Sequence, residues 1–223
     1  MQSPPAIVRA LHADELAFAR THDPSFARKR QVLIRSLGAR PRLLAEVLKL
    51  APNERDDLLA RRDLQRLAAK SPPLKARIRV RPAPPAATLR GWYGEAERRF
   101  RVRWQLLAAV NFVESAFGKV RNTSTAGAQG PMQFLPATWD AYGLGGNVHD
   151  PHDAILGAAN YLRANGAGHD ERAALYHYNH SSLYVDAVLH YAHRITHVAD
   201  AFAEYYAWDV YVRTPTGERR YGP

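Results

Sequence analysis

Glu114 is the residue of this 223-residue chain best suited by its surroundings to transfer a proton. It follows a strongly apolar run at 104–113, which predicts a buried helix. A carboxyl group delivered by an apolar helix is partly desolvated, and desolvation raises its pKa, so the group stays protonated near neutrality. We interpret Glu114 as a general acid; the competing interpretation is an ordinary surface glutamate at a helix end.

Two further motifs lie downstream of Glu114. The stretch 127–134 reads Gly-Ala-Gln-Gly-Pro-Met-Gln-Phe, and its glycines allow the backbone to approach a ligand closely. Tyr178 and Asn179 then supply an aromatic ring and an amide. By itself each of these three motifs is weak evidence for assigning the chain to a family, but together, in this order and spacing, they are strong evidence.

Glu114-Ser115, Gly127–Gln133 and Tyr178-Asn179 resemble the signature of the lytic transglycosylases, lysozyme-like enzymes that cleave bacterial peptidoglycan. The resemblance covers roughly residues 92–198 and includes the soluble and goose-type-lysozyme-like members. Pro131 stands where the soluble type usually has leucine, which blurs the subfamily. The resemblance implies a mainly α, lysozyme-like catalytic domain. It also implies a set of substrate-binding residues: Ser115, Ser124, Gln129, Met132, Gln133, Tyr178 and Asn179.

The resemblance further implies a reaction that needs one carboxylate instead of the usual pair. Glu114 would protonate the glycosidic oxygen between N-acetylmuramic acid and N-acetylglucosamine, and would then act as base on the 6-hydroxyl of the muramoyl sugar. The product would carry a 1,6-anhydromuramoyl end. Two alternatives stay open: a hydrolytic muramidase on the same fold, and a non-catalytic protein that binds the cell wall or assists its assembly. For Ser115 a purely structural role at the helix end is equally open.

Composition predicts how the chain is organised. Residues 1–70 contain several amphipathic helical stretches, with a helix start at Asp23-Pro24 and another helix at 41–50. Residues 71–87 hold five prolines, which predicts an extended linker. Residues 88–223 then form the expected catalytic domain, which should fold alone and which ends in a small β element near 209–217, where the pattern alternates and turns.

The positive charge lies in the first part of the chain. Residues 1–90 carry 19 Lys and Arg against 8 Asp and Glu, whereas the chain as a whole has a net charge of +10. We expect peptidoglycan strands as the main partner, and this basic region could add attraction to an anionic membrane surface or to wall polymers. Solvated helix faces are the simpler explanation of the charge, and we expect no nucleic-acid partner.

Neither a cofactor nor a metal is expected. His190, His193 and His197 fall at helical spacing, but no carboxylate or thiol completes a ligand set on the same face, and the chain has no cysteine. No apolar run of about 18 residues and no export signal is visible. Activity on peptidoglycan nevertheless predicts an extracytoplasmic location, in the cell wall or periplasm of a bacterium.

Overall fold

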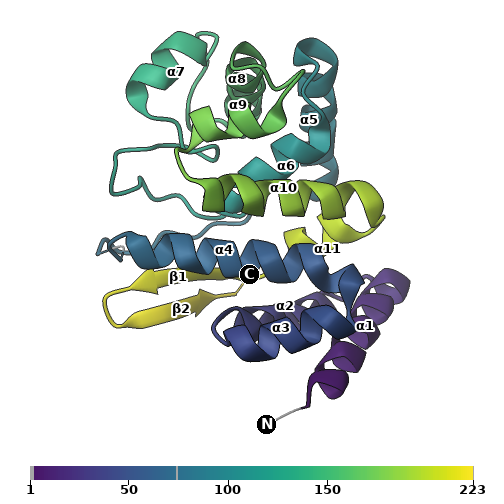
Figure 1. Cartoon of the computed structure of the whole chain (residues 1–223). Coiled ribbons are helices and arrows are strands. Elements are labelled where there is room, and N and C mark those ends of the chain that lie inside the picture. The colour runs from purple at the N-terminus through teal and green to yellow at the C-terminus, as the bar shows by residue number, and fades with distance from the viewer. Residues whose placement is uncertain (1–2, 74, 223) are drawn as a thin grey trace.

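The protein is mainly α-helical, as predicted, in the computed structural model, which describes residues 3–73 and 75–222 (Figure 1). A short antiparallel hairpin of strands β1 (Val210–Thr214) and β2 (Gly217–Tyr221) confirms the predicted C-terminal β element. Among the described residues, no helix is long and apolar enough to cross a membrane. The helices, in chain order, are α1 (Pro4–Thr21), α2 (Pro24–Gly38), α3 (Pro41–Leu50), the 3₁₀ helix η1 (Pro52–Glu54), α4 (Arg55–Lys70), α5 (Ala86–Phe100), α6 (Trp104–Ser115), α7 (Pro136–Tyr142), α8 (Pro151–Ala164), α9 (Glu171–Tyr178), α10 (Ser182–His197) and α11 (Ala201–Ala207).

Local signals in the sequence account for several of these boundaries. The Asp23 side chain accepts a hydrogen bond of 2.8 Å from the backbone N–H of Ser25, and Pro24 occupies the first position of α2. This is the predicted helix start, because a capping carboxylate satisfies an N–H group that has no partner inside the helix. Helix α3 also has the predicted bounds, 41–50.

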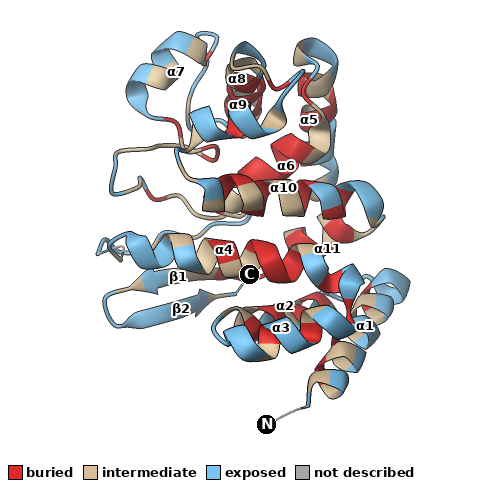
Figure 2. Cartoon of the chain, viewed as in Figure 1, coloured by how far each residue is buried: buried red, intermediate tan, exposed pale blue. Residues whose placement is uncertain are grey.

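Helix α10 lies at the centre of the molecule, packed between α4 and α6 (Figure 1). Helices α5, α8 and α9 surround α6 on one side of α10, while α1, α2 and α3 lie beyond α4 on the other side. The buried residues of α4, α6 and α10 are concentrated where these helices face one another (Figure 2). The first four helices therefore share one hydrophobic core with the rest of the protein.

A buried cluster of charged side chains joins the first helices to the last ones. Arg30 on α2 contacts Glu54, Asp57 and Glu204, its Nη1 lying 2.7 Å from a Glu204 oxygen. Arg194 on α10 contacts two of these three carboxylates, Glu204 at 2.9 Å and Asp57 at 3.1 Å. All five side chains are at most 5% exposed. Removing one partner from such a cluster leaves an uncompensated buried charge, which costs about 3–5 kcal/mol.

The proline-rich stretch is extended, and part of it is hydrogen-bonded to the loop after α6. Arg81 N–H donates to the carbonyl of Lys119 at 3.0 Å, and Arg121 N–H donates to the carbonyl of Arg79 at 2.9 Å. The Asn122 side chain adds a bond of 2.8 Å from the Arg79 N–H. The domain boundaries proposed from the sequence stay a prediction, but the shared core and the ionic cluster argue against independent folding of residues 88–223.

Candidate active site

The carboxyl group of Glu114 lies in the last turn of α6, at the edge of the core. Residues 106–111 of this helix are buried, and Ala116 ends it with a left-handed backbone, φ 51°. Glu114 itself is half-buried. Burial raises the pKa of Glu114 from its ordinary value of 4.5 to about 7, in the direction that the apolar run at 104–113 predicts.

Tyr184, on the first turn of α10, is the side chain that holds this carboxyl group. Its hydroxyl donates a hydrogen bond of 2.6 Å to Glu114 Oε1, and this bond lowers the pKa of Glu114, opposing the larger effect of burial. Tyr184 belongs to none of the sequence motifs and was not predicted as a site residue, because only the packing of α10 against α6 brings its ring to Glu114. Near neutrality the carboxyl group is thus divided between its protonated and ionised forms, which suits a group that must both give and take a proton.

The glycine-rich loop is held by hydrogen bonds to α6 and to α9. Gly130 has φ +73°, and a Cβ atom there would lie 1.9 Å from the carbonyl oxygen of Val148, so only glycine fits. The carbonyl of Met132 accepts a hydrogen bond of 2.6 Å from the Tyr178 hydroxyl, and its sulfur accepts one of 2.9 Å from the Asn111 amide. Met132 is therefore buried and packs between α6 and α9.

A small pocket of about 210 Å³ lies beside Tyr178 and Gln133. The Tyr178 ring is parallel to that of Tyr184, with 6.5 Å between their centroids. Gln133 directs its amide nitrogen to the carbonyl of Gly130 at 2.9 Å. Asn179 follows Tyr178 as the residue that ends α9, and it is half-buried. Tyr178 is thus linked to Glu114 through Tyr184, and the assignment of Tyr178, Asn179 and Gln133 to a substrate site stays a prediction.

The remaining predicted residues support the loop in this structure. The Ser115 hydroxyl is buried; it donates to the carbonyl of Pro131 and accepts from the N–H of Gly118, which favours the structural role that the sequence left open. The Ser124 hydroxyl accepts from the N–H of Ala128 at 2.9 Å and so stabilises a turn. The backbone of Gln129 pairs with that of Phe134. Their assignment as substrate-binding residues stays a prediction.

A second pocket, of about 280 Å³, contains Glu114 itself and has a different wall. It is lined by the end of α6 together with residues of α2, α4 and β1, including Arg35, Arg61 and Tyr211, and by Asp209, which precedes β1. Asp209 is buried and already paired, with Arg28 at 3.2 Å and Arg220 at 2.6 Å. The first helices were not predicted to contribute to this pocket, because their local sequence pattern contains no information about tertiary contacts with α6.

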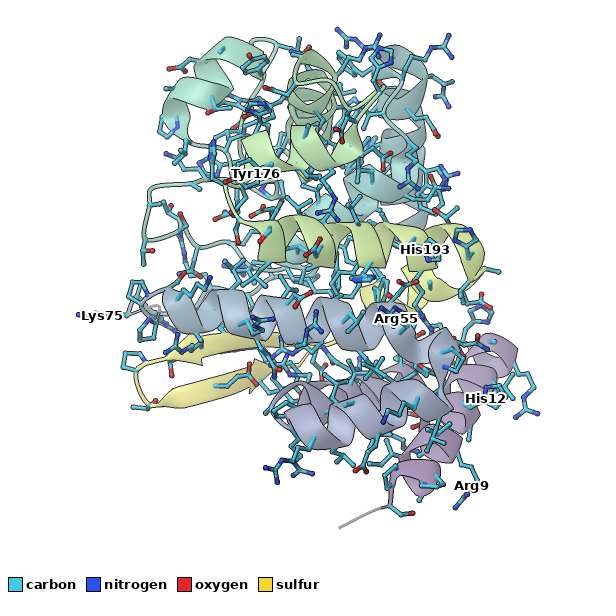
Figure 3. The ribbon with its side chains drawn as sticks, viewed as in Figure 1. Arg9, His12, Arg55, Lys75, Tyr176 and His193 are labelled. Carbon is cyan, nitrogen blue, oxygen red and sulfur yellow. The ribbon has the colours of Figure 1, made fainter. Side chains whose placement is uncertain are left out.

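The three histidines of α10 do not converge on one point. His190 Nδ1 and His193 Nδ1 lie 2.8 Å and 2.6 Å from the two oxygens of Asp56, at the start of α4, and His197 Nδ1 lies 2.8 Å from the carbonyl of His193. Figure 3 shows His193 on α10 above Arg55, the first residue of α4. Among the described residues there is no cluster of three or more His, Cys, Asp or Glu that could hold a metal ion. That the protein needs no metal stays a prediction.

Comparison with known proteins identifies the region that contains Glu114. Residues 92–194 match the family model described as a transglycosylase SLT domain. A protein of Enterobacteria phage PRD1 named "Transglycosylase" is 40% identical over 72 residues, which cover 32% of this chain and 26% of the phage protein. The match thus spans about a quarter of that relative's length. No solved structure matches the chain.

Proposed function

Because residues 92–194 belong to the transglycosylase SLT domain family, whose members act on peptidoglycan, we propose that this protein is a peptidoglycan lytic transglycosylase. The observation that carries the proposal is the state of Glu114, whose pKa is raised by burial to about 7 while Tyr184 holds its carboxyl group at 2.6 Å. Such a group is an effective general acid and, once ionised, an effective general base at neutral pH.

In the proposed reaction Glu114 first donates its proton to the glycosidic oxygen that joins N-acetylmuramic acid to N-acetylglucosamine, and the bond from C1 to that oxygen breaks. The ionised carboxylate then takes the proton of the 6-hydroxyl, whose oxygen bonds to C1. The product ends in a 1,6-anhydromuramoyl group, no water is consumed, and Glu114 is protonated again.

The environment of Glu114 favours a reaction with one free carboxylate. The other carboxylate that lines its pocket, Asp209, is about 1% exposed and is held by two arginines. It is therefore poorly suited to be the second carboxylate that a hydrolytic glycosidase uses as nucleophile or base. We accordingly propose anhydro ends over hydrolysis. A peptidoglycan substrate also makes an extracytoplasmic site of action part of this proposal.

The test is to digest purified sacculi with the protein and to analyse the released muropeptides by mass spectrometry. Anhydro ends are lighter than reducing ends by one water, so the mass identifies the reaction directly. We expect anhydro ends from the wild type and none from the Glu114→Gln variant, which keeps the shape of the side chain but cannot transfer the proton. Reducing ends would instead identify a muramidase, and the absence of cleavage would favour a non-catalytic wall-binding protein.

A further inference from the structure

Two arginines from outside the matched domain lie in the pocket that contains Glu114. Arg35 is on α2 and Arg61 is on α4, whereas the match to the transglycosylase SLT domain begins at residue 92. Their side chains are 12% and 15% exposed, so both guanidinium groups are largely withdrawn from water. Positive charge from the first helices thus lies in the wall of a pocket that Glu114 also lines.

These two charges share one exposed counter-charge. Both guanidinium groups contact the same oxygen, Oε1, of Glu218 on β2, and the Arg61 contact is 3.3 Å. Glu218 is 44% exposed, so water weakens its attraction. Arg61 Nε is buried and has no hydrogen-bond acceptor among the described residues. Burial, together with the neighbouring Arg35, lowers the pKa of Arg61 to about 10, which indicates positive charge that is only partly compensated.

The arginines are also held in position for a ligand. The Arg35 guanidinium lies 3.7 Å from the centroid of the Tyr211 ring on β1, a cation–π contact that fixes its plane. Arg61 and Tyr211 also line a third pocket, which is larger, at about 560 Å³, and whose wall includes Arg213 and Glu218. Arg61 and Tyr211 thus belong to the walls of both this pocket and the one that contains Glu114.

We propose that Arg35 and Arg61 form a carboxylate-binding subsite beside Glu114 that recognises the acidic substituent of muramic acid. This inference rests on the proposed function and adds a determinant of specificity to it. The ligand is a carboxylate, either that of the lactyl group or one of the attached peptide, and it displaces Glu218 from the guanidinium groups. A planar guanidinium pairs with a carboxylate through two parallel hydrogen bonds, which lysine cannot reproduce. A glycan without muramic acid offers no such group.

Kinetics with three substrates tests the subsite and identifies the carboxylate. The substrates are peptide-bearing glycan strands, the same strands freed of peptide by an amidase, which exposes the lactyl carboxylate, and strands whose carboxylates have been amidated. We expect Arg61→Gln and Arg35→Gln to raise KM about tenfold on the first or second substrate, with kcat little changed, because a charged hydrogen bond is lost. The substrate that shows the effect identifies the source, and the amidated strands should show none.

The matched control is Arg42→Gln, on the exposed face of α3, which removes the same charge far from the pocket. Its KM should equal that of the wild type. Glu218→Gln should have the opposite effect to Arg61→Gln and lower KM for the carboxylate-bearing strands, since it removes the competing internal carboxylate. This variant also tests the subsite if Arg61→Gln fails to fold.

Binding measurements separate failure of the subsite from failure of the proposed function. In the Glu114→Gln background, calorimetry should find tighter binding of a disaccharide of N-acetylglucosamine and N-acetylmuramic acid than of the neutral N-acetylglucosamine dimer. Arg61→Gln should remove the difference. If the wild type cleaves sacculi but Arg61→Gln and Arg42→Gln are alike on every substrate, the subsite is wrong and the proposed function stands. Equal affinity for the two disaccharides, together with an unchanged KM of Arg61→Gln on peptide-bearing strands, would also overturn the subsite, because both sources of the carboxylate would then be excluded.

Discussion

Two sides of the molecule meet near Glu114, and they are held in different ways. On the first side, within residues 92–194, Gly130 fits closely under Val148, and Tyr184 and Tyr178 donate hydroxyl hydrogen bonds. On the second side, the first four helices are held by charges: Arg30 shares buried carboxylates with Arg194 of the first side, and Arg35 and Arg61 line a pocket that Glu114 also lines. The proposed chemistry thus belongs to one side, and the second side supplies position and charge.

Disrupting the buried ionic cluster should have the largest effect on stability. We expect Arg30→Met to lower the free energy of unfolding by about 3–5 kcal/mol, because three buried carboxylates lose a shared counter-charge. Urea unfolding followed by circular dichroism measures this change. Arg42→Met, at an exposed site on α3, is the control and should stay within about 0.5 kcal/mol of the wild type. Similar stability of the two variants would mean that the ionic cluster does not hold the two sides together.

A substitution that disturbs the backbone at Gly130, on the first side, should lower the stability of the protein somewhat less. Gly130→Ala places a Cβ atom 1.9 Å from the Val148 carbonyl at φ +73°, and we expect it to destabilise the protein by about 3 kcal/mol. Gly127→Ala is matched in backbone, at φ +87°, but a Cβ atom there would have no neighbour within 4 Å. This control should therefore cost only about 1 kcal/mol for the left-handed backbone. Equal losses in thermal melting would show that the contact with Val148 is not close.

The Glu114 carboxyl group should destabilise the fold at alkaline pH. Its pKa is about 7 in the folded protein against an ordinary 4.5, so below pH 4.5 both states bind the proton and no cost arises. Between pH 4.5 and 7 the unfolded chain releases this proton while the folded protein keeps it, so the free energy of unfolding falls by about 2–3 kcal/mol, allowing for the partial exposure of Glu114, and stays at that lower value above pH 7. Glu114→Gln should therefore be more stable than the wild type at pH 8 and equal at pH 4.

Chemical unfolding at several pH values measures this difference. Glu46→Gln, on the exposed face of α3, is the control and should follow the wild type throughout. A Glu114→Gln variant that gains nothing between pH 5 and 8 would contradict the raised pKa.

The hydrogen bond from Tyr184 should have the smallest effect. Tyr184→Phe removes the donor that lowers the pKa of Glu114, so that pKa should rise further, by about one unit. The alkaline limb of the profile of kcat/KM against pH should move to higher pH by the same amount. Tyr176→Phe is the control, because Tyr176 lies on the exposed side of α9 (Figure 3), and its profile should not move.

Local patterns were sufficient to predict several elements. The pair Asp23-Pro24 marked the start of α2, and the alternation near 209–217 marked the hairpin, because caps and alternation act between near neighbours. The apolar run before Glu114 indicated its desolvation for the same reason. These features depend on a few adjacent residues, which a single sequence displays directly.

The second side of the pocket could not be predicted in this way. Arg35 and Arg61 belong to helices that look like ordinary solvated, basic helices, and only tertiary packing places them in a pocket that Glu114 also lines. The proline-rich stretch suggested separate folding of residues 88–223, but the shared core and the ionic cluster depend on tertiary contacts that prolines do not reveal. The division into domains stays a prediction.

The ionic cluster also has a consequence for the order in which the molecule folds. Arg30 and Glu204 are separated by 174 positions in the chain, so their contact closes a loop that includes most of the protein. Contacts of such high sequence separation cost chain entropy and form late. A nascent chain emerging from the ribosome can build α1–α4 early, but it cannot neutralise Arg30 with Glu204 until α11 has been synthesised. The pocket around Glu114 is likewise completed only after β1 has been synthesised, because residues 208–212 form part of its wall.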